Sequence, residues 1–172
     1  MIKVLPHNGV IGSEIRPLYF YRAMGMDVRN ARIISFGACN FACPYCKRDG
    51  AFRDKCGDII NAADVTLEGI FCVCDDAHAK GQVVRLSGGD PVVFPQVSLA
   101  IAKYMWETYG AKISMAHNGS SPEFARKMAP YLESAAIDLK AVPVEFGMRS
   151  GLAPEQGERM YGRALQTQGH VE

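Results

Sequence analysis

Four short apolar segments of this chain each end at a group of glycines or polar residues. They cover residues 32–36, 82–87, 113–117 and 135–140. Apolar residues at helical spacing lie between them, and strands that alternate with helices predict right-handed βαβ units around a parallel sheet. The carboxyl ends of parallel strands meet at one edge, where α/β proteins place their sites. We therefore expect an α/β chain with a site at that edge.

Helix start and stop signals agree with this alternation. Thr66 can cap a helix that ends at Gly81, and Pro95 suits the first turn of a helix that ends at Gly110. A third helix is expected from Ser121-Pro122-Glu123 through Met128 and Leu132, and a fourth over residues 159–168.

The first of the four strand ends carries Cys39, Cys43 and Cys46 in a C-x3-C-x2-C frame. Three thiolates this close can ligate three irons of a [4Fe–4S] cluster, and the fourth iron then stays open to a small molecule. Zinc accepts the same soft ligands, so a structural zinc site completed by Asp49 or a histidine is the alternative. Zinc modules usually carry a second cysteine pair a dozen or more residues away, and no such pair follows here.

The other three cysteines have simpler interpretations. Cys72 and Cys74 lie two residues apart on an expected helix, so their side chains diverge and cannot chelate one metal. Cys74 fits the apolar stripe of that helix, and Cys72 is expected near the surface. Cys56 is the one candidate for a fourth ligand, which would close the cluster to a small molecule.

Size and charge restrict the class of protein. A chain of 172 residues can form one domain with a genuine core. A formal net charge of +1 gives no electrostatic reason to expect nucleic acid or an anionic membrane as a partner. The sequence shows no apolar run of transmembrane length and no signal peptide, so its six cysteines indicate a reducing cytoplasm where thiols serve metals or catalysis.

The cysteine frame resembles that of the radical S-adenosylmethionine (SAM) superfamily. In that superfamily a later strand ends in Gly-Gly-Glu-Pro, and this chain has Gly88-Gly89-Asp90-Pro91. The resemblance implies a partial (β/α) barrel of about four βα units, a [4Fe–4S] cluster and SAM as cofactors. It also implies reductive cleavage of SAM to a 5′-deoxyadenosyl radical, which abstracts hydrogen from a substrate.

Within the superfamily the chain looks most like the pyruvate formate-lyase activating enzyme branch. The Cys-Pro-Tyr-Cys ending of the cysteine frame, Asn118-Gly119 and Asp138-Leu139-Lys140 carry this likeness. It implies that Cys39, Cys43 and Cys46 hold the cluster. The residues expected to contact SAM are Tyr45, Gly88, Gly89, Asp90, Asn118, Asp138 and Lys140. His117 reads either as a hydrogen-bonded histidine at a strand end or as a group that contacts substrate.

Two segments depart from the pattern of that branch. Lys47-Arg48-Asp49-Gly50 replaces the usual residues after the cluster frame, and Ala116-His117 replaces Asp-Thr before Asn118. A glycine in a partner glycyl radical enzyme is the first substrate that the resemblance implies, and a peptide or a small metabolite is the alternative. From another class, a zinc-binding or electron-transfer module without catalysis remains open.

The expected organisation is an N-terminal extension over residues 1–30 and a radical SAM core over residues 31–172. Radical SAM cores usually contain six βα units, and the four units expected here leave the last strands missing. Since an open half-barrel exposes a sheet edge and an apolar face, we expect either a homodimer or a missing C-terminal part. Expected partners are a one-electron donor such as flavodoxin or ferredoxin and a glycyl radical enzyme, with neither nucleic acid nor membrane.

Overall fold

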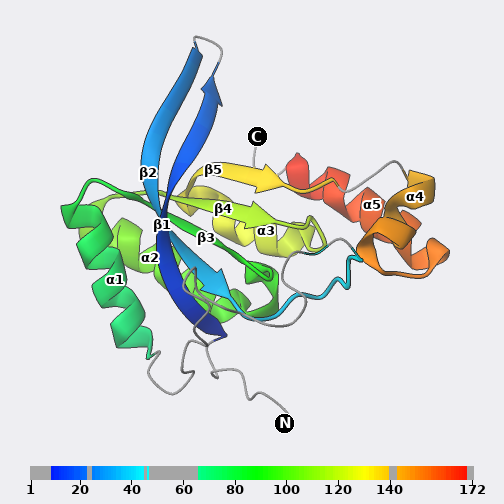
Figure 1. Cartoon of the computed structure of the whole chain (residues 1–172), viewed down its shortest axis with the longest axis horizontal. Helices are drawn as coiled ribbons and strands as arrows, with labels where there is room; N and C mark the ends of the chain where they lie inside the picture. Colours follow the sequence, from blue (N-terminus) through cyan, green and yellow to red (C-terminus); the bar gives the residue numbers. More distant parts are fainter. Residues whose placement is uncertain (1–8, 23–24, 45, 47–65, 140–142, 170–172) are drawn as a thin grey trace.

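One five-stranded sheet organises the chain, with helices packed on it (Figure 1). The computed structural model describes residues 9–22, 25–44, 46, 66–139 and 143–169. The strand order is β1-β2-β3-β4-β5, so each strand pairs with its neighbour in the sequence. β1 and β2 pair antiparallel as a hairpin, and the three pairings from β2 to β5 are parallel. The predicted α/β class, a partial radical SAM-type barrel, is confirmed.

The strands are β1 (Val10–Arg22), β2 (Gly25–Phe36), β3 (Val83–Gly88), β4 (Ile113–His117) and β5 (Leu132–Ile137). The α-helices are α1 (Leu67–Ala79), α2 (Pro95–Tyr109), α3 (Pro122–Met128), α4 (Pro143–Ser150) and α5 (Pro154–Gln168). Two short 3-10 helices, η2 (Pro91–Val93) and η3 (Ala129–Tyr131), follow β3 and α3.

The predicted strands and helices are largely present, with three differences. The fourth strand was expected over residues 135–140 but covers Leu132–Ile137, so Asp138 follows the strand end instead of lying within it. The third helix stops at Met128, because Pro130 cannot continue an α-helix and lies instead in a separate 3-10 helix over Ala129–Tyr131. The hairpin and α4 were not expected, and the first half of the hairpin lies within the predicted N-terminal extension.

The main core lies between the sheet and the helices α1, α2 and α3. Strand residues on this face are large and apolar, and the helices contribute their buried stripes. Cys74 is fully buried in this core and Cys72 is exposed, as the helical spacing predicted. The buried members include Ile34, Phe36, Val84, Leu86, Ile113 and Met115 from the sheet and Ile70, Ile101, Met105 and Met128 from the helices.

The opposite face of the sheet is more polar. Arg85 alternates with Val84 and Leu86 along β3, so its side chain lies on the face away from the helices. Its guanidinium donates a hydrogen bond of 2.8 Å to the hydroxyl of Ser114, which also accepts from Ser134 at 2.9 Å. These three residues come from three adjacent parallel strands, β3, β4 and β5.

The sheet is curved, because two strands that are not neighbours in it are joined by an ion pair. The Arg29 guanidinium of β2 lies 3.1 Å from the Glu133 carboxylate of β5, although β3 and β4 separate these strands in the sheet order. Curvature of this kind is what a partial barrel requires. Among the described residues, no helix is long and apolar enough to cross a membrane.

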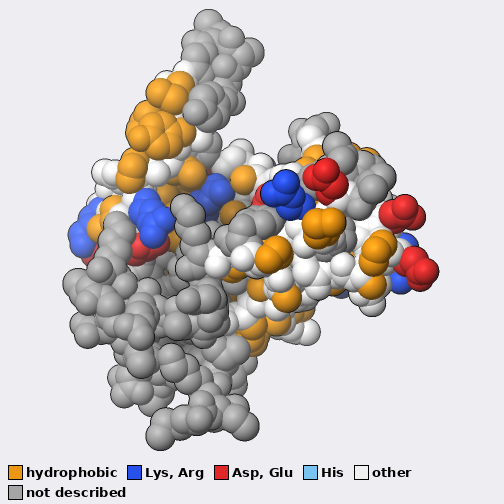
Figure 2. All heavy atoms as spheres, turned by 45° about the vertical axis from the view of Figure 1, so that its right-hand side comes forward, with side chains coloured by type: hydrophobic (Ala, Val, Ile, Leu, Met, Phe, Trp, Pro, Cys, Tyr) orange, Lys and Arg blue, Asp and Glu red, His pale blue; other side chains and the backbone are white. Residues whose placement is uncertain are grey.

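The β1–β2 hairpin projects beyond the rest of the sheet and exposes one apolar face (Figures 1 and 2). Tyr19 pairs directly with Val28, and Ile15 and Met26 lie on the same face by the strand register. Each of these four side chains is 45–56% exposed. The opposite face of the hairpin carries charged residues such as Arg16 and Asp27. This face of Ile15, Tyr19, Met26 and Val28 is called the hairpin stripe below.

Candidate functional site

The loop that carries the three cysteines begins directly after β2 and is bonded to the end of β3. The Gly89 N–H donates to the Phe36 carbonyl at 2.7 Å, and the Asp90 N–H donates to the Ala38 carbonyl at 2.8 Å. Two of the predicted motifs, the cysteine frame and Gly88-Gly89-Asp90, are therefore joined by main-chain hydrogen bonds at the same sheet edge.

Both glycines of the second motif are needed for this close approach. A Cβ on Gly89 would lie 2.0 Å from the Ala38 carbonyl oxygen, and one on Gly88 would lie 2.3 Å from the Phe36 nitrogen. Gly88 also has φ +109°, which other residues rarely adopt. The backbone at Gly88 and Gly89 therefore approaches the end of β2 and the start of the cysteine loop.

The three thiols lie on one short loop whose chemistry suits an iron–sulfur cluster. Cys39 and Cys46 are exposed and Cys43 is half-buried, and the Cys46 N–H donates to the Cys43 carbonyl at 3.0 Å. Among the described residues, no three His, Cys, Asp or Glu side chains lie close enough together to hold one metal ion. In a [4Fe–4S] cluster each thiolate ligates a different iron, so the three sulfurs do not have to meet at one ion.

Cys39 already has the hydrogen-bond donors that a cluster thiolate accepts. Its sulfur lies 3.4 Å from the Phe41 N–H and 3.7 Å from the Asn118 side-chain nitrogen. Partial loss of water around the sulfur raises the pKa of Cys39, and the two hydrogen bonds oppose that rise. These donors, together with the three soft sulfurs, fit a bound cluster.

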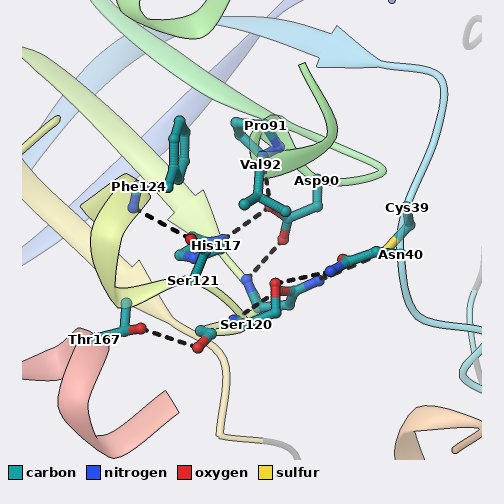
Figure 3. A network of polar contacts seen from close by, with 12 residues as sticks. Cys39, Asn40, Asp90, Pro91, Val92, His117, Ser120, Ser121, Phe124 and Thr167 are labelled. Carbon is teal, nitrogen blue, oxygen red and sulfur yellow. Dashed lines mark hydrogen bonds and ion pairs between the residues drawn. The ribbon is translucent and has the colours of Figure 1, made fainter. Parts of the chain in front are cut away.

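Behind Cys39 lies a buried polar network centred on Asp90 (Figure 3). One carboxylate oxygen of Asp90 lies 2.8 Å from His117 Nδ1 and accepts the Val92 N–H at 2.9 Å. The other accepts the Asn118 N–H at 2.7 Å. Asp90, His117 and Asn118 are each at most 4% exposed. His117 is thus a hydrogen-bonded histidine at a strand end, and its Nε2 has no partner within the described residues.

The structure places the predicted SAM contacts in three different situations. Gly88 and Gly89 lie at the sheet edge beside the cysteine loop, and Asp138 is exposed just beyond β5 with its N–H bonded to the His117 carbonyl. Asp90 and Asn118 are buried in the network. Tyr45, Lys140 and Cys56 lie outside the described residues, so their predicted roles stay predictions.

The helices α4 and α5 hold the cysteine loop from the side opposite β3. The rings of Phe41 and Phe146 meet edge to face with centroids 6.0 Å apart. Cys43 packs against the hydrophobic cluster that these two rings form with Ala164. Gly151, between the two helices, lies so near the loop that a Cβ would be 2.1 Å from the Ala42 carbonyl oxygen. The Thr167 hydroxyl of α5 donates to the Gly119 carbonyl at 2.9 Å.

Sequence reasoning missed these supporting residues. Nothing local in the sequence distinguishes Gly151 or Thr167 from residues of an ordinary surface turn or helix. Their partners lie 48 to 109 positions away in the sequence, as the pairs Thr167–Gly119 and Gly151–Ala42 show. An apolar residue between two cysteines, Phe41, was the one signal that could have pointed to packing of the loop.

Comparison with known proteins identifies the family. Residues 33–160 match the Radical SAM superfamily, about three quarters of the chain, so this chain belongs to that superfamily. Members of the superfamily use a [4Fe–4S] cluster and SAM. These are the two cofactors that the cysteine frame predicted.

Two curated relatives belong to other branches than the predicted one. A 7-carboxy-7-deazaguanine synthase of Methanothermobacter thermautotrophicus is 25% identical over 126 residues, which cover 72% of this chain and 47% of the relative. A GTP 3′,8-cyclase of Campylobacter fetus is 29% identical over 113 residues, which cover 66% of this chain and 33% of the relative. The chain thus spans about half or a third of the relatives that it matches, and neither is a glycyl radical activator.

Proposed function

We propose that this chain is a radical SAM enzyme that abstracts hydrogen from a small anionic metabolite. The observation that supports an anionic substrate is the position of Arg85 on the polar face of the sheet. Its side chain is half-buried, and no carboxylate pairs with it among the described residues. A guanidinium in this situation favours an anion, because burial of an unpaired charge is costly.

Several further features support an anionic substrate. Burial lowers the pKa of Arg85, but a guanidinium stays charged at any pH at which the protein is folded. Ser114 and Ser134 offer hydroxyls beside it on the neighbouring strands. The names of both relatives describe guanine-type molecules, one of them the triphosphate GTP. A nucleotide phosphate or a carboxylate would suit this arginine and serine group.

The roles of the other residues follow from their positions. We assign the cluster to Cys39, Cys43 and Cys46, and when bound it supplies the electron that cleaves SAM. The backbones of Gly88 and Gly89 and the carboxylate of Asp138 lie at the same edge and are the proposed SAM contacts in the described part of the chain. Tyr45 and Lys140 are proposed contacts from the sequence, and Lys140 would pair as a point charge with the SAM carboxylate.

The first experiment tests the cluster. Anaerobic reconstitution should load close to four irons per chain, and Cys39→Ala, Cys43→Ala or Cys46→Ala should each abolish loading. Cys72→Ala is the matched control, because Cys72 is exposed on α1 and should leave the iron content unchanged. Reduced protein with SAM should release 5′-deoxyadenosine. Stoichiometric zinc without iron in protein that was prepared anaerobically would contradict the proposal.

The second experiment tests the substrate class. Binding of GTP and of guanosine to the reconstituted protein is measured by calorimetry. GTP should bind at least tenfold more tightly than guanosine, and Arg85→Gln should remove that difference. Arg32→Gln is the control, because Arg32 is paired with Asp76 on the helix side of the sheet. Equal binding of both ligands by the wild type would argue against an anion site at Arg85.

Activation of a glycyl radical enzyme is the second candidate function. The likeness of Asn118-Gly119 and Asp138-Leu139-Lys140 to the activating enzyme branch favours it. An electron paramagnetic resonance spectrum of reduced protein mixed with SAM and a glycyl radical enzyme from the same organism decides between the two functions. A glycyl radical doublet would support activation, and hydrogen transfer to a guanine-type metabolite without such a doublet would support the first proposal.

A further inference from the structure

The side-chain amide of Asn118 is held in one orientation. Its oxygen accepts the Ser120 N–H at 3.0 Å, and the residue is only 4% exposed. The main-chain N–H of Asn118 is bonded to Asp90, which is itself fixed by Val92 and His117. Because the amide oxygen faces the Ser120 N–H, the NH₂ group must point the other way, toward the cysteine loop.

Both hydrogens of that NH₂ group have acceptors on the loop. The nitrogen lies 2.7 Å from Asn40 Oδ1 and 3.7 Å from Cys39 Sγ. The reversed amide would set its oxygen against the Asn40 oxygen and against the sulfur, and both contacts would be repulsive. Asn40 in turn donates to the Ser120 hydroxyl at 2.9 Å, which closes a ring of hydrogen bonds beside Cys39.

We propose that Asn118 is a positioning residue that raises the reduction potential of the cluster through an N–H···S hydrogen bond to Cys39. This inference rests on the proposed function, which places the cluster on Cys39. Reduction adds negative charge to the cluster and its thiolates, so a donor aimed at a thiolate sulfur stabilises the reduced state more than the oxidised state. Asp90 serves this role indirectly, because it anchors the main chain of Asn118.

The test compares three variants by redox titration of the reconstituted cluster, followed by electron paramagnetic resonance. Asn118→Leu keeps the approximate size but has no donor, and its potential should be more negative than that of the wild type. Asn118→Asp keeps the acceptor for the Ser120 N–H but places an oxygen near the sulfur, so its potential should fall further. Asn30→Leu is the matched control, because Asn30 is exposed on the hairpin, where it pairs with Pro17, and this variant should keep the wild-type potential.

The outcomes separate this proposal from the proposed function. Wild-type protein that binds no iron would overturn the assignment of the cluster itself. Wild-type protein that binds a cluster, with the same potential in Asn118→Leu and Asn118→Asp, would overturn only the role of Asn118. If both variants lose the cluster yet unfold at the wild-type temperature, the contact governs retention of the cluster and not its potential, and the proposal is overturned. Loss of the cluster together with a lowered unfolding temperature would make Asn118 merely structural and refute it.

Discussion

At the scale of single residues, the closest contacts of the site are made by glycines. Gly89 has no side chain between its Cα and the Ala38 carbonyl. The backbone after β3 can therefore form hydrogen bonds with the start of the cysteine loop. A methyl group at that point meets backbone atoms that cannot rotate away. The contact therefore transmits any change at Gly89 directly to the loop.

The substitution Gly89→Ala should reduce both stability and iron content. Overpacking of this kind costs about 1–3 kcal/mol, and relief of the clash has to move Ala38 and the cysteines after it. Thermal unfolding and iron analysis after reconstitution measure the two effects. Gly162→Ala is the control, because no atom lies within 4 Å of its added Cβ and alanine should stabilise the helix by about 0.5–1 kcal/mol. Full iron loading in Gly89→Ala would show that the loop does not depend on this contact.

The residues of the site could be predicted from the sequence where their function depends on local spacing. The cysteine frame and the glycine pair are of this kind, since each is a short motif at a strand end. The contacts of Asp90 could not be predicted, because its partners His117 and Asn118 are 27 and 28 positions away. Whether a carboxylate at that position faces a ligand or the protein interior depends on how β4 packs beside β3.

At the scale of elements, the contact of α4 and α5 with the cysteine loop is the least expected feature. Both helices contain glycines, such as Gly147 and Gly157, that lower helix propensity. Their stability therefore comes from tertiary packing, through the buried side chains of Phe146, Ala164 and Thr167. This is why the sequence predicted only the last part of α5 and none of α4. The hairpin was missed for a related reason, since Pro17 interrupts the strand pattern of β1.

The substitution Gly151→Ala tests whether this helix pair supports the loop. Gly151 has φ +67° and its added Cβ would lie 2.1 Å from the Ala42 carbonyl oxygen. Gly110→Ala is a matched control, because Gly110 has φ +62° but its Cβ would meet nothing within 4 Å. Both variants should lose about 1–2 kcal/mol of stability from the left-handed backbone. Only Gly151→Ala should also load less iron, and equal iron content in the two variants would contradict the support role.

A second test at this scale concerns the helices α1 and α2. The hydroxyls of Tyr104 and Tyr109 on α2 donate to the Asp75 carboxylate of α1 at 2.7 and 2.8 Å. The hydrogen bond to Asp75 is the main cause that raises the pKa of Tyr104 to about 12. An unfolded tyrosine titrates near pH 10, so the folded protein holds this proton more tightly. The resulting stabilisation is present below about pH 10 and is lost as the pH rises toward 12.

The substitution Tyr104→Phe should therefore reduce the alkaline loss of stability. The unfolding temperature of the wild type should fall between pH 9 and pH 11.5, and that of Tyr104→Phe should fall by less. Tyr19→Phe on the exposed hairpin is the control and should follow the wild type. Identical pH profiles of the wild type and Tyr104→Phe would contradict the assigned hydrogen bond.

At the scale of the whole molecule, the hairpin stripe is a large apolar surface away from the site. Its four side chains lie on the same face of the sheet as the helices α1 and α2. They lie beyond the part of that face which the helices cover, so they are exposed. Contiguous exposed apolar surface of this kind favours association. The homodimer that the sequence analysis considered remains a proposal, and this stripe is where we expect copies of the chain to meet.

The double substitution Tyr19→Thr and Val28→Thr tests this expectation. Threonine keeps the strand preference and removes most of the apolar surface of the pair. Analytical ultracentrifugation of the wild type should show a mass that rises with protein concentration, whereas the double variant should stay monomeric. Trp106→Gln is the control, because Trp106 is 44% exposed on α2 rather than on the hairpin. A monomeric wild type at all concentrations would show that the stripe does not mediate association.

The strand order has a consequence for the synthesis of this chain. Since every strand pairs with the one before it, each βα unit can dock as soon as it leaves the ribosome. The cysteine loop emerges early, but Phe146, Gly151 and Thr167, which complete its surroundings, emerge more than a hundred residues after Cys39. The nascent chain therefore carries its thiols through the synthesis of about a hundred further residues without the helices that contact them. We expect the finished loop, and hence assembly of its metal centre, only after α5 has been released.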